Sequence, residues 1–301
     1  MRVLVTGAGG FIGRSVVRKA RERGWEVTGV ARRPCPEANQ IADLCQPIEN
    51  WPAPDAVIHL AGAYVGCDDR ELAESDLKIA VNLLDWGQRQ GVRRWVFAGA
   101  AEVYGDIAGE AGENWPCRPV IPYGRAKLEI ERLFQAAGLP ELTICRLGEV
   151  YGPNSRILSE LGGRLRRGFC PWPGDGNVKI SFVHVEDVAE ALLLAAERAA
   201  QESRVYNVGD DEPATWRHFL DSMAEMLCVR HAIYLPLPVA RGYAACASWV
   251  DANITPHVLR LLTTPKVLSS ERARAELGFV PRYPSFLEGL KEVFRGSIQN
   301  Q

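Results

Sequence analysis

The sequence contains no long run of like charge and no apolar run long enough to cross a membrane. Its 301 residues carry 35 Lys and Arg against 37 Asp and Glu, which gives a formal charge of −2. This balance provides little sequence-independent attraction to nucleic acid or to an anionic lipid surface. We therefore expect a globular protein that acts on a small-molecule substrate, with neither nucleic acid nor a membrane as its partner.

Cysteine pairs at metal-ligand spacing are also missing. The eight cysteines are scattered, with no Cys-x-x-Cys pair and no histidine nearby at ligand spacing, so we expect reduced thiols and no metal site. The chain starts with MRVLVTGAGG, where glycines follow too few apolar residues to form the hydrophobic segment of a signal peptide. This start predicts a cytoplasmic protein.

Short apolar segments rich in β-branched residues alternate with helical patterns from the first residues onward. In order they are RVLVTG, IGRSVVRKARERG, WEVTGVA, DAVIHLAG, LKIAVNLLDWGQRQG and RRWVFAG. This alternation predicts βαβ units and a parallel sheet that helices bury on both faces. Because such crossovers are right-handed, the predicted fold class is α/β with a doubly wound parallel sheet, the Rossmann type.

The pattern loosens in the second half of the chain. The segment RLRRGFCPWPGDGN interrupts the alternation, and two further strands, ISFVHV and SRVYNVG, are expected to return to the sheet. We predict a dinucleotide-binding domain over residues 1–152, with strands from about 178–209 returning to it. Residues 153–177 and 210–301 should form a smaller mixed lobe over the carboxyl ends of the strands, where open α/β sheets bind ligands.

The segment TGAGGFIG places Gly7, Gly10 and Gly13 at the turn from the first strand into the first helix. Glycines at these positions allow a tight turn, close approach of the backbone to a pyrophosphate, and close packing of helix on sheet. The helix N-terminus adds free N–H groups and the positive end of a dipole. The turn therefore predicts a phosphate-binding cradle.

The Gly-x-x-Gly-x-x-Gly spacing resembles that of the short-chain dehydrogenase/reductase superfamily, and the rest of the chain resembles its extended, epimerase/dehydratase-like branch. The motifs that carry this resemblance occur in order over nearly the whole chain: TGAGGFIG, Asp43-Leu44, HLAG at 59–62, VYG at 103–105, YGRAK at 123–127, RLGEVYGP at 146–153, GDGNVKISFVHVEDVAEA at 174–191, VYNVG at 205–209 and ARAELGFVPR at 273–282.

The resemblance implies a bound nicotinamide dinucleotide. Its pyrophosphate would lie over the glycine turn, its adenine beside the segment after the second crossover, and its ribose or nicotinamide against the HLAG segment. The residues implied are Gly7, Gly10, Phe11, Ile12 and Gly13 for the pyrophosphate, Asp43 and Leu44 for the adenine, and Leu60, Ala61 and Gly62 for the remainder. The family habit also implies a homodimer, built through helices of the sheet domain.

The residues after the second strand bear on the choice between NAD and NADP. A carboxylate at this strand end accepts hydrogen bonds from the ribose 2′-OH of NAD, whereas arginine accommodates the 2′-phosphate of NADP. In WEVTGVARRP the position is Ala31, followed by Arg32 and Arg33. We therefore predict NADP(H), with NAD possible if the two arginines form only a solvated surface pair.

The segment YGRAK opens an amphipathic helical pattern, in which Tyr123 and Lys127 share one face because they are four residues apart. The resemblance gives Tyr123 the role of general acid/base on the substrate oxygen. It gives Lys127 the roles of lowering the pKa of the tyrosine by its charge and of holding the nicotinamide ribose.

The segment WVFAGAAEVYG lacks a hydroxyl where the family has one. In the family a Ser or Thr, three residues before the Val of VYG, hydrogen-bonds the substrate oxygen, and here Ala100 stands at that position. Losing one positioned donor to a developing oxyanion typically costs about 10²–10³ in kcat. Glu102 on the same turn would contribute only if protonated, and a structural or solvated role is the alternative.

Two further substitutions bear on the substrate. Sugar-nucleotide members of the family hold the diphosphate with an Asn and an Arg, at positions that here carry Glu149 and Ile180. A carboxylate repels phosphate and isoleucine offers no donor, which disfavours a nucleotide sugar. Tyr64 and Trp172 are candidates to line a more apolar pocket, although tryptophans mostly pack in cores.

These features favour an NADP(H)-dependent oxidoreductase or epimerase that acts on a secondary alcohol or ketone other than a nucleotide sugar. The intact Tyr123 and Lys127 pair supports this interpretation. The alternative is a cofactor-binding sensor or assembly subunit with little or no turnover, which Ala100 supports.

Overall fold

The computed structural model describes residues 1–49, 51–62, 69–198, 203–247 and 256–298. Tyr64, which we predicted to line the substrate pocket, lies outside the described residues.

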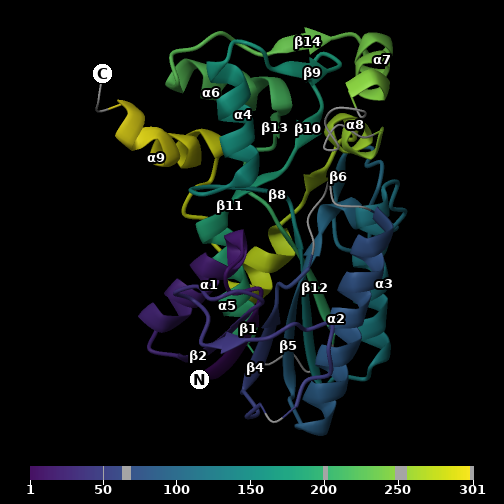
Figure 1. Cartoon of the computed structure of the whole chain (residues 1–301), viewed down its shortest axis with the longest axis vertical. Coiled ribbons are helices and arrows are strands. Elements are labelled where there is room, and N and C mark those ends of the chain that lie inside the picture. Colours follow the sequence, from purple (N-terminus) through teal and green to yellow (C-terminus); the bar gives the residue numbers. More distant parts are fainter. Residues whose placement is uncertain (50, 63–68, 199–202, 248–255, 299–301) are drawn as a thin grey trace.

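Seven parallel strands form the main sheet, in the order β12-β7-β5-β4-β1-β2-β3 (Figure 1). Most are continuous apolar segments, as expected for strands covered on both faces, and β4 is buried along its whole length. The strands are β1 (Arg2–Thr6), β2 (Glu26–Ala31), β3 (Gln40–Ile41), β4 (Ala56–His59), β5 (Arg94–Ala100), β7 (Glu141–Leu147) and β12 (Arg204–Val208).

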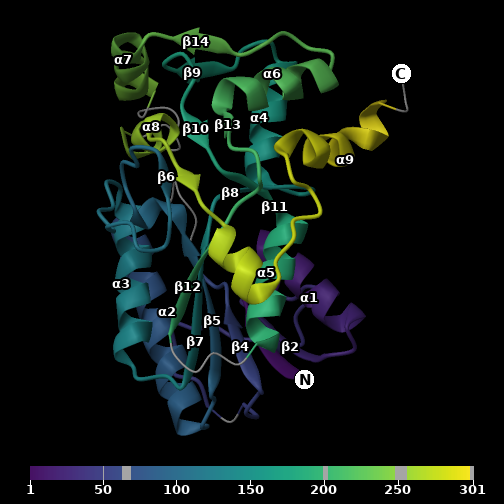
Figure 2. The same cartoon turned by 180° about the vertical axis from the view of Figure 1, so that it is seen from behind.

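Two layers of helices cover this sheet. Helices α1 (Phe11–Glu22) and α5 (Val185–Glu197) bury their apolar faces on one side, in a core that includes Val16 and Leu192. Helices α2 (Asp69–Arg89) and α3 (Pro122–Ala136) cover the other side, where Leu83 and Phe134 are buried. Figures 1 and 2 show the two layers from opposite directions. The predicted α/β class with a doubly wound parallel sheet is confirmed.

The smaller lobe lies beyond the carboxyl ends of the strands, in the upper part of Figures 1 and 2. It contains short strands in two-residue and three-residue pairs, and its core is dominated by aromatic rings such as Phe182, Phe219 and Trp216. Its elements are β8 (Glu149–Tyr151), α4 (Arg156–Arg166), β9 (Pro171–Pro173), β10 (Lys179–Ile180), β11 (Phe182–His184), β13 (Ala214–Thr215), α6 (Trp216–Met226), β14 (Ile233–Leu235), α7 (Leu237–Ala247), α8 (Pro256–Thr263) and α9 (Phe286–Ile298).

Three connecting elements complete the fold. A single 3-10 turn, η1 (Ala101–Val103), follows β5 directly. The short strands β6 (Glu110–Ala111) and β15 (Val267–Leu268) pair in parallel, which brings the late part of the chain back to the edge of the sheet domain. A π-helical turn, η2 (Ala273–Leu277), precedes α9.

Only one of the two strands that we expected to return to the main sheet does so. The segment SRVYNVG supplies β12, but ISFVHV supplies β10 and β11, which pair with β13 and β8 in separate small sheets. The aromatic side chain of Phe182 explains the difference, because it stacks on Phe219 of the smaller lobe at 4.5 Å and belongs to that core. The expectation that both strands rejoin the sheet was wrong for residues 180–184.

Within the described residues no helix is long and apolar enough to cross a membrane.

Candidate active site

The glycine turn between β1 and α1 forms a cradle with no room for side chains. Gly7 has a φ of +68°, and a Cβ on Gly13 would lie 2.1 Å from the carbonyl oxygen of Gly7. Gly10 caps α1 without a side-chain hydrogen bond, so the first N–H groups of the helix, from Phe11 onward, are left for a ligand. Backbone donors at a helix N-terminus fit a pyrophosphate, and the chain therefore fits the cofactor that its sequence implies.

The segments implied for the rest of the cofactor lie at the same edge of the sheet. The backbone N–H groups of Leu60 and Ala61 donate to the hydroxyl of Thr6 at 3.1 and 3.0 Å, which holds the end of β4 beside the glycine turn. A Cβ on Gly62 would lie 2.7 Å from the carboxylate of Asp76 on α2.

Farther along this edge, the two residues predicted beside the adenine differ in burial. Leu44 is buried, whereas Asp43 is exposed and accepts a hydrogen bond from the backbone N–H of Cys45 at 3.0 Å. Arg32 and Arg33 directly follow β2, and both are exposed.

Tyr123 and Lys127 lie in the first two turns of α3, which starts at Pro122, a residue suited to the first position of a helix. The ammonium of Lys127 lies 5.6 Å from the ring centre of Tyr123 and 5.5 Å from that of Phe97 on β5. Lys127 is buried and Tyr123 is partly exposed. The predicted pair is therefore brought together at the carboxyl edge of the sheet.

Asp76 is a buried residue that the sequence analysis did not single out. Its carboxylate lies 3.8 Å from the ammonium of Lys127, and both side chains are almost fully buried. Burial lowers the pKa of Lys127, although Asp76 and two other carboxylates partly offset that effect. Asp76 thus stabilises the charged form of Lys127. Its own negative charge also offsets the positive charge that Lys127 exerts on neighbouring groups.

The pKa of Tyr123 is displaced in the opposite direction from the one expected. Burial raises this pKa, and the carboxylates of Glu102, Asp76 and Glu149 raise it further. We expected Lys127 to lower it, but Asp76 lies close to that ammonium and reduces its effect. The Tyr123 phenol therefore holds its proton through the neutral pH range in this state of the protein.

Ala100, Glu102 and Glu149 follow two neighbouring strands. Ala100 on β5 is the register partner of Leu147 on β7. Glu102 lies two residues after Ala100, and Glu149 lies two residues after Leu147. The backbone of Glu102 also packs on α3, because a Cβ on Gly124 would lie 2.4 Å from its carbonyl oxygen. The missing hydroxyl and both carboxylates thus lie beside the helix that carries Tyr123.

Lys266 joins these two carboxylates, and the sequence analysis missed it. Its ammonium donates to Glu102 Oε1 at 2.7 Å and to Glu149 Oε2 at 3.2 Å. Burial opposes the charge on Lys266, but the two carboxylates outweigh it and raise its pKa. The pKa of Glu149 is also raised, mainly by burial.

The backbone of Lys266 is fixed as firmly as its side chain. Its N–H donates to the carbonyl of Lys179 at 3.0 Å, and its carbonyl accepts from the N–H of Ser181 at 2.7 Å. Residues from the two predicted lobes therefore meet in one buried cluster of charges.

The remaining predicted substrate residues lie in the core of the smaller lobe. Ile180 is fully buried on β10, and Trp172 on β9 is 3% exposed, with its ring centre 5.0 Å from that of Trp216. The burial of Trp172 agrees with a role in core packing, which is the alternative to contact with the substrate. Its contact with substrate stays a prediction.

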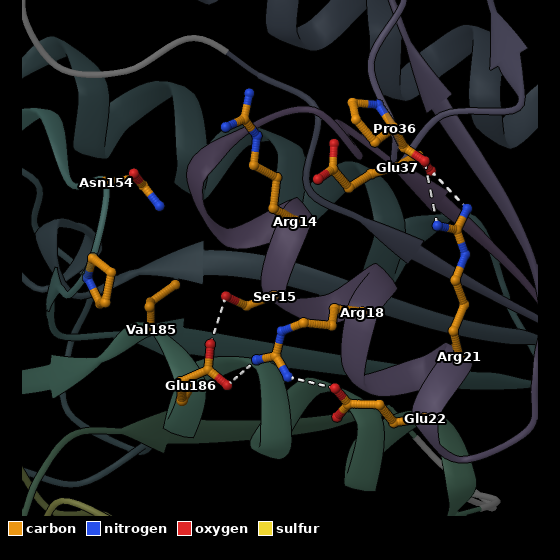
Figure 3. Close-up of a pocket in the computed structure, with 11 residues that line it drawn as sticks. Arg14, Ser15, Arg18, Arg21, Glu22, Pro36, Glu37, Asn154, Val185 and Glu186 are labelled. Carbon is orange, nitrogen blue, oxygen red and sulfur yellow. Dashed lines mark hydrogen bonds and ion pairs between the residues drawn. The ribbon is translucent and has the colours of Figure 1, made fainter.

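An open groove of about 760 Å³ lies beside α1, and neither Tyr123 nor Lys127 is among the residues that line it (Figure 3). Part of its charge is paired, since Arg18 bonds to both Glu186 and Glu22, and Ser15 donates to Glu186 at 2.9 Å. Arg14 points away from this network in Figure 3, and its Nε donates to the carbonyl of Gly9 beside the cradle at 3.1 Å. Among the described residues no group of three metal-ligating side chains is present.

A family model described as the NAD dependent epimerase/dehydratase family matches residues 3–209 of the chain. The chain belongs to this family. It is therefore an enzyme of the extended short-chain dehydrogenase/reductase superfamily, with a nicotinamide dinucleotide, NAD or NADP, as its cofactor. The resemblance inferred from the motifs is confirmed.

Individual relatives cover nearly the whole chain. A 3-diazoavenalumate denitrifying reductase from a Streptomyces species is 29% identical, over 96% of this chain and 99% of its own length. The structure of MoeE5 in complex with UDP-glucose and NAD has a TM-score of 0.80 at 27% identity and covers 100% of this chain and 99% of its own. The human epimerase family protein SDR39U1 with NADPH has a TM-score of 0.81 at 25% identity and covers 98% of this chain and 99% of its own.

Proposed function

We propose that the chain is an NADP(H)-dependent oxidoreductase that works mainly as a reductase on a small ketone-like substrate other than a nucleotide sugar. The observation that carries this proposal is the Tyr123 and Lys127 pair on α3, at the carboxyl edge of the sheet that also carries the glycine cradle. The curated relatives include both ketoreductases and UDP-glucose epimerases, so the family alone leaves this choice open.

The chemistry divides between cofactor and chain. A bound reduced nicotinamide supplies the hydride. Tyr123 holds the proton that a new alkoxide needs, and Lys127 lies where it can bind the cofactor ribose. The raised pKa of Tyr123 keeps the phenol protonated at neutral pH, which is the form that reduction of a ketone requires. The Streptomyces relative is likewise named a reductase.

The preference for NADP(H) over NAD(H) is supported by the two arginines after β2. Arg32 and Arg33 are exposed at the strand end where a 2′-phosphate would lie, and Ala31 leaves no carboxylate there to repel it. The human structural neighbour was solved with NADPH and MoeE5 with NAD, so related folds accept either cofactor.

The exclusion of nucleotide sugars is supported by Glu149 and Ile180. MoeE5 binds UDP-glucose on a similar fold, but here a carboxylate and an isoleucine occupy the two positions predicted to hold a diphosphate. We expect no thermal stabilisation of the NADPH complex by UDP-, GDP- or dTDP-sugars. A clear stabilisation by any of them at micromolar concentration would restore the sugar-nucleotide epimerase as the better assignment.

The direct test is NADPH oxidation by the purified protein with a broad panel of ketones, aldehydes and imines. Turnover that disappears in Tyr123→Phe, with NADPH binding retained, supports the proposal. Tight NADPH binding with no turnover on any compound would favour the second candidate, a cofactor-binding sensor or assembly subunit, for which Ala100 is the supporting observation. A homodimer through helices of the sheet domain stays a prediction, which size-exclusion chromatography with light scattering tests.

A further inference from the structure

The substrate side of the active site carries an uncompensated negative charge. Glu102, Glu149 and Lys266 form one hydrogen-bonded cluster with two carboxylates and one ammonium. The side chains of the two glutamates remain 12% and 16% exposed, whereas that of Lys266 is 3% exposed. The two glutamates are therefore more accessible than the lysine that joins them.

The neighbouring charges do not cancel this excess. The ammonium of Lys127 is matched by the carboxylate of Asp76 at 3.8 Å. One turn further along α3, Glu131 matches Arg146 of β7 at 2.8 Å, and both are buried. These two cations thus each have a carboxylate of their own, and the Glu102–Lys266–Glu149 cluster adds one further negative charge.

This charge opposes the ordinary reduction of a neutral ketone. Hydride addition to a carbonyl builds negative charge on oxygen, and catalysis needs donors aimed at that atom. Here Ala100 supplies no donor, and the carboxylates of Glu102 and Glu149 already raise the pKa of Tyr123. A positive charge on the substrate would reverse the effect, because the same carboxylates would then attract it.

We propose that the natural substrate carries a positively charged nitrogen at or next to the reacting carbon, and that Glu102 and Glu149 bind this nitrogen while Lys266 holds the two carboxylates in place. The proposal rests on the proposed reductase function and adds the class of its substrate. Lys266 acts as a positioning residue, since the glutamates shield it from the ligand.

Two substrate types share this chemistry. In an iminium, hydride forms a bond to carbon while the π electrons of the C=N bond become the lone pair of a neutral amine, and no proton is required. In a ketone beside an ammonium group, hydride forms a bond to the carbonyl carbon and Tyr123 gives its proton to the oxygen. In both cases the reductant is the reduced nicotinamide, which leaves as its oxidised form.

The test uses matched three-carbon ketones: aminoacetone as the cation, hydroxyacetone as the neutral compound and pyruvate as the anion. Their binding is measured by calorimetry on the protein saturated with NADP⁺, where no reduction can occur. We expect aminoacetone to bind at least about tenfold more tightly than hydroxyacetone, and pyruvate to bind most weakly. Pyruvate binding as tightly as aminoacetone would overturn the proposal.

The matched variants are Glu149→Gln and Glu129→Gln. Both remove one carboxylate charge and nearly no volume, but Glu129 lies on the exposed side of α3. We expect Glu149→Gln to reduce the preference for the cation to about twofold or less and Glu129→Gln to preserve it. If both variants keep the full preference, and Glu102→Gln keeps it as well, the cluster does not select the charge and the proposal is wrong.

NADPH oxidation with the same compounds and an N-methylated cyclic iminium separates this inference from the proposed function. Faster consumption of the iminium or of aminoacetone identifies which nitrogen compound the site takes. Selective binding of cations without any NADPH consumption would refute the reductase and leave the charge selection standing. Equal kcat/KM for hydroxyacetone and aminoacetone would keep the reductase and refute the charge selection.

Discussion

The cofactor half of the active site is made of backbone, whereas the substrate half is made of buried charges. At the cradle, Gly7 and Gly13 leave space that any side chain would fill, and the donors are main-chain N–H groups. On the substrate side, Glu102 of η1 and Glu149 of β8 are joined through Lys266 from the late part of the chain. The first half is set by local geometry and the second by contacts between distant segments.

This difference explains why one half follows its family and the other departs from it. A pyrophosphate is the same in every relative, so its cradle needs the same tight turn. The substrate differs among relatives, and the residues that face it change without affecting the fold. The two halves should therefore be separable by mutation, with cofactor binding and turnover lost independently.

The largest effect is expected from Tyr123→Phe, which removes the proton donor and leaves the cradle intact. With ketone substrates we expect turnover to fall about 10³-fold, within the range for loss of a general acid, and NADPH affinity to change little. Steady-state kinetics and fluorescence titration of NADPH measure the two quantities. Tyr206→Phe is the control, because it removes a hydroxyl on the edge strand β12 that donates a hydrogen bond to Glu276 of η2. Undiminished turnover in Tyr123→Phe would remove this residue from the mechanism.

The second-largest effect is expected from Gly13→Ala, which should weaken cofactor binding. In Gly13→Ala the new methyl group would lie 2.1 Å from the carbonyl oxygen of Gly7, so the turn must shift. We expect the Kd of NADPH to rise about 100-fold, which corresponds to the roughly 3 kcal/mol that over-packing can cost. Gly112→Ala is the control, since a Cβ there meets no atom within 4 Å. A folded Gly13→Ala protein with normal NADPH affinity would contradict the cradle assignment.

The sequence predicted the cofactor half and much of the fold because those features are local. The glycine turn and the Tyr123 and Lys127 pair each occupy fewer than about ten residues, and fixed periodicities place them on one turn or one helix face. Lys266 had no such signal, since 117 residues separate it from Glu149 and no motif marks it. The strand at 182–184 was misplaced because apolar alternation shows burial but not which core receives the side chains.

The third effect concerns the part of the cofactor half that does use side chains. In the double variant Arg32→Ala with Arg33→Ala, we expect NADPH to bind about 30-fold more weakly and NADH to bind about as before. This loss equals roughly 2 kcal/mol, a typical value for a charge-assisted contact to phosphate. Titration with both cofactors measures it, and Arg125→Ala on the exposed side of α3 is the control. Equal binding of NADPH and NADH by the unmodified protein would show instead that both arginines are solvated surface residues.

The smallest expected effect is a gain, and it returns to the missing hydroxyl at the start of η1. Ala100→Ser places a hydroxyl at the end of β5, at the position where the family has one. For neutral ketones we expect kcat/KM to rise about tenfold, less than the 10²–10³ that a native oxyanion donor supplies, because Glu102 and Glu149 still oppose a developing negative charge. For an iminium substrate no such gain is expected, since its reduction builds no negative charge for a hydroxyl to stabilise. Steady-state kinetics of Ala100→Ser with a neutral ketone and with an iminium therefore test two claims: that the site lacks an oxyanion donor, and that an iminium does not need one. An equal gain for both types would mean that Ala100 simply lacks a useful donor, whereas a loss for both would mean that the space above Ala100 is filled by substrate.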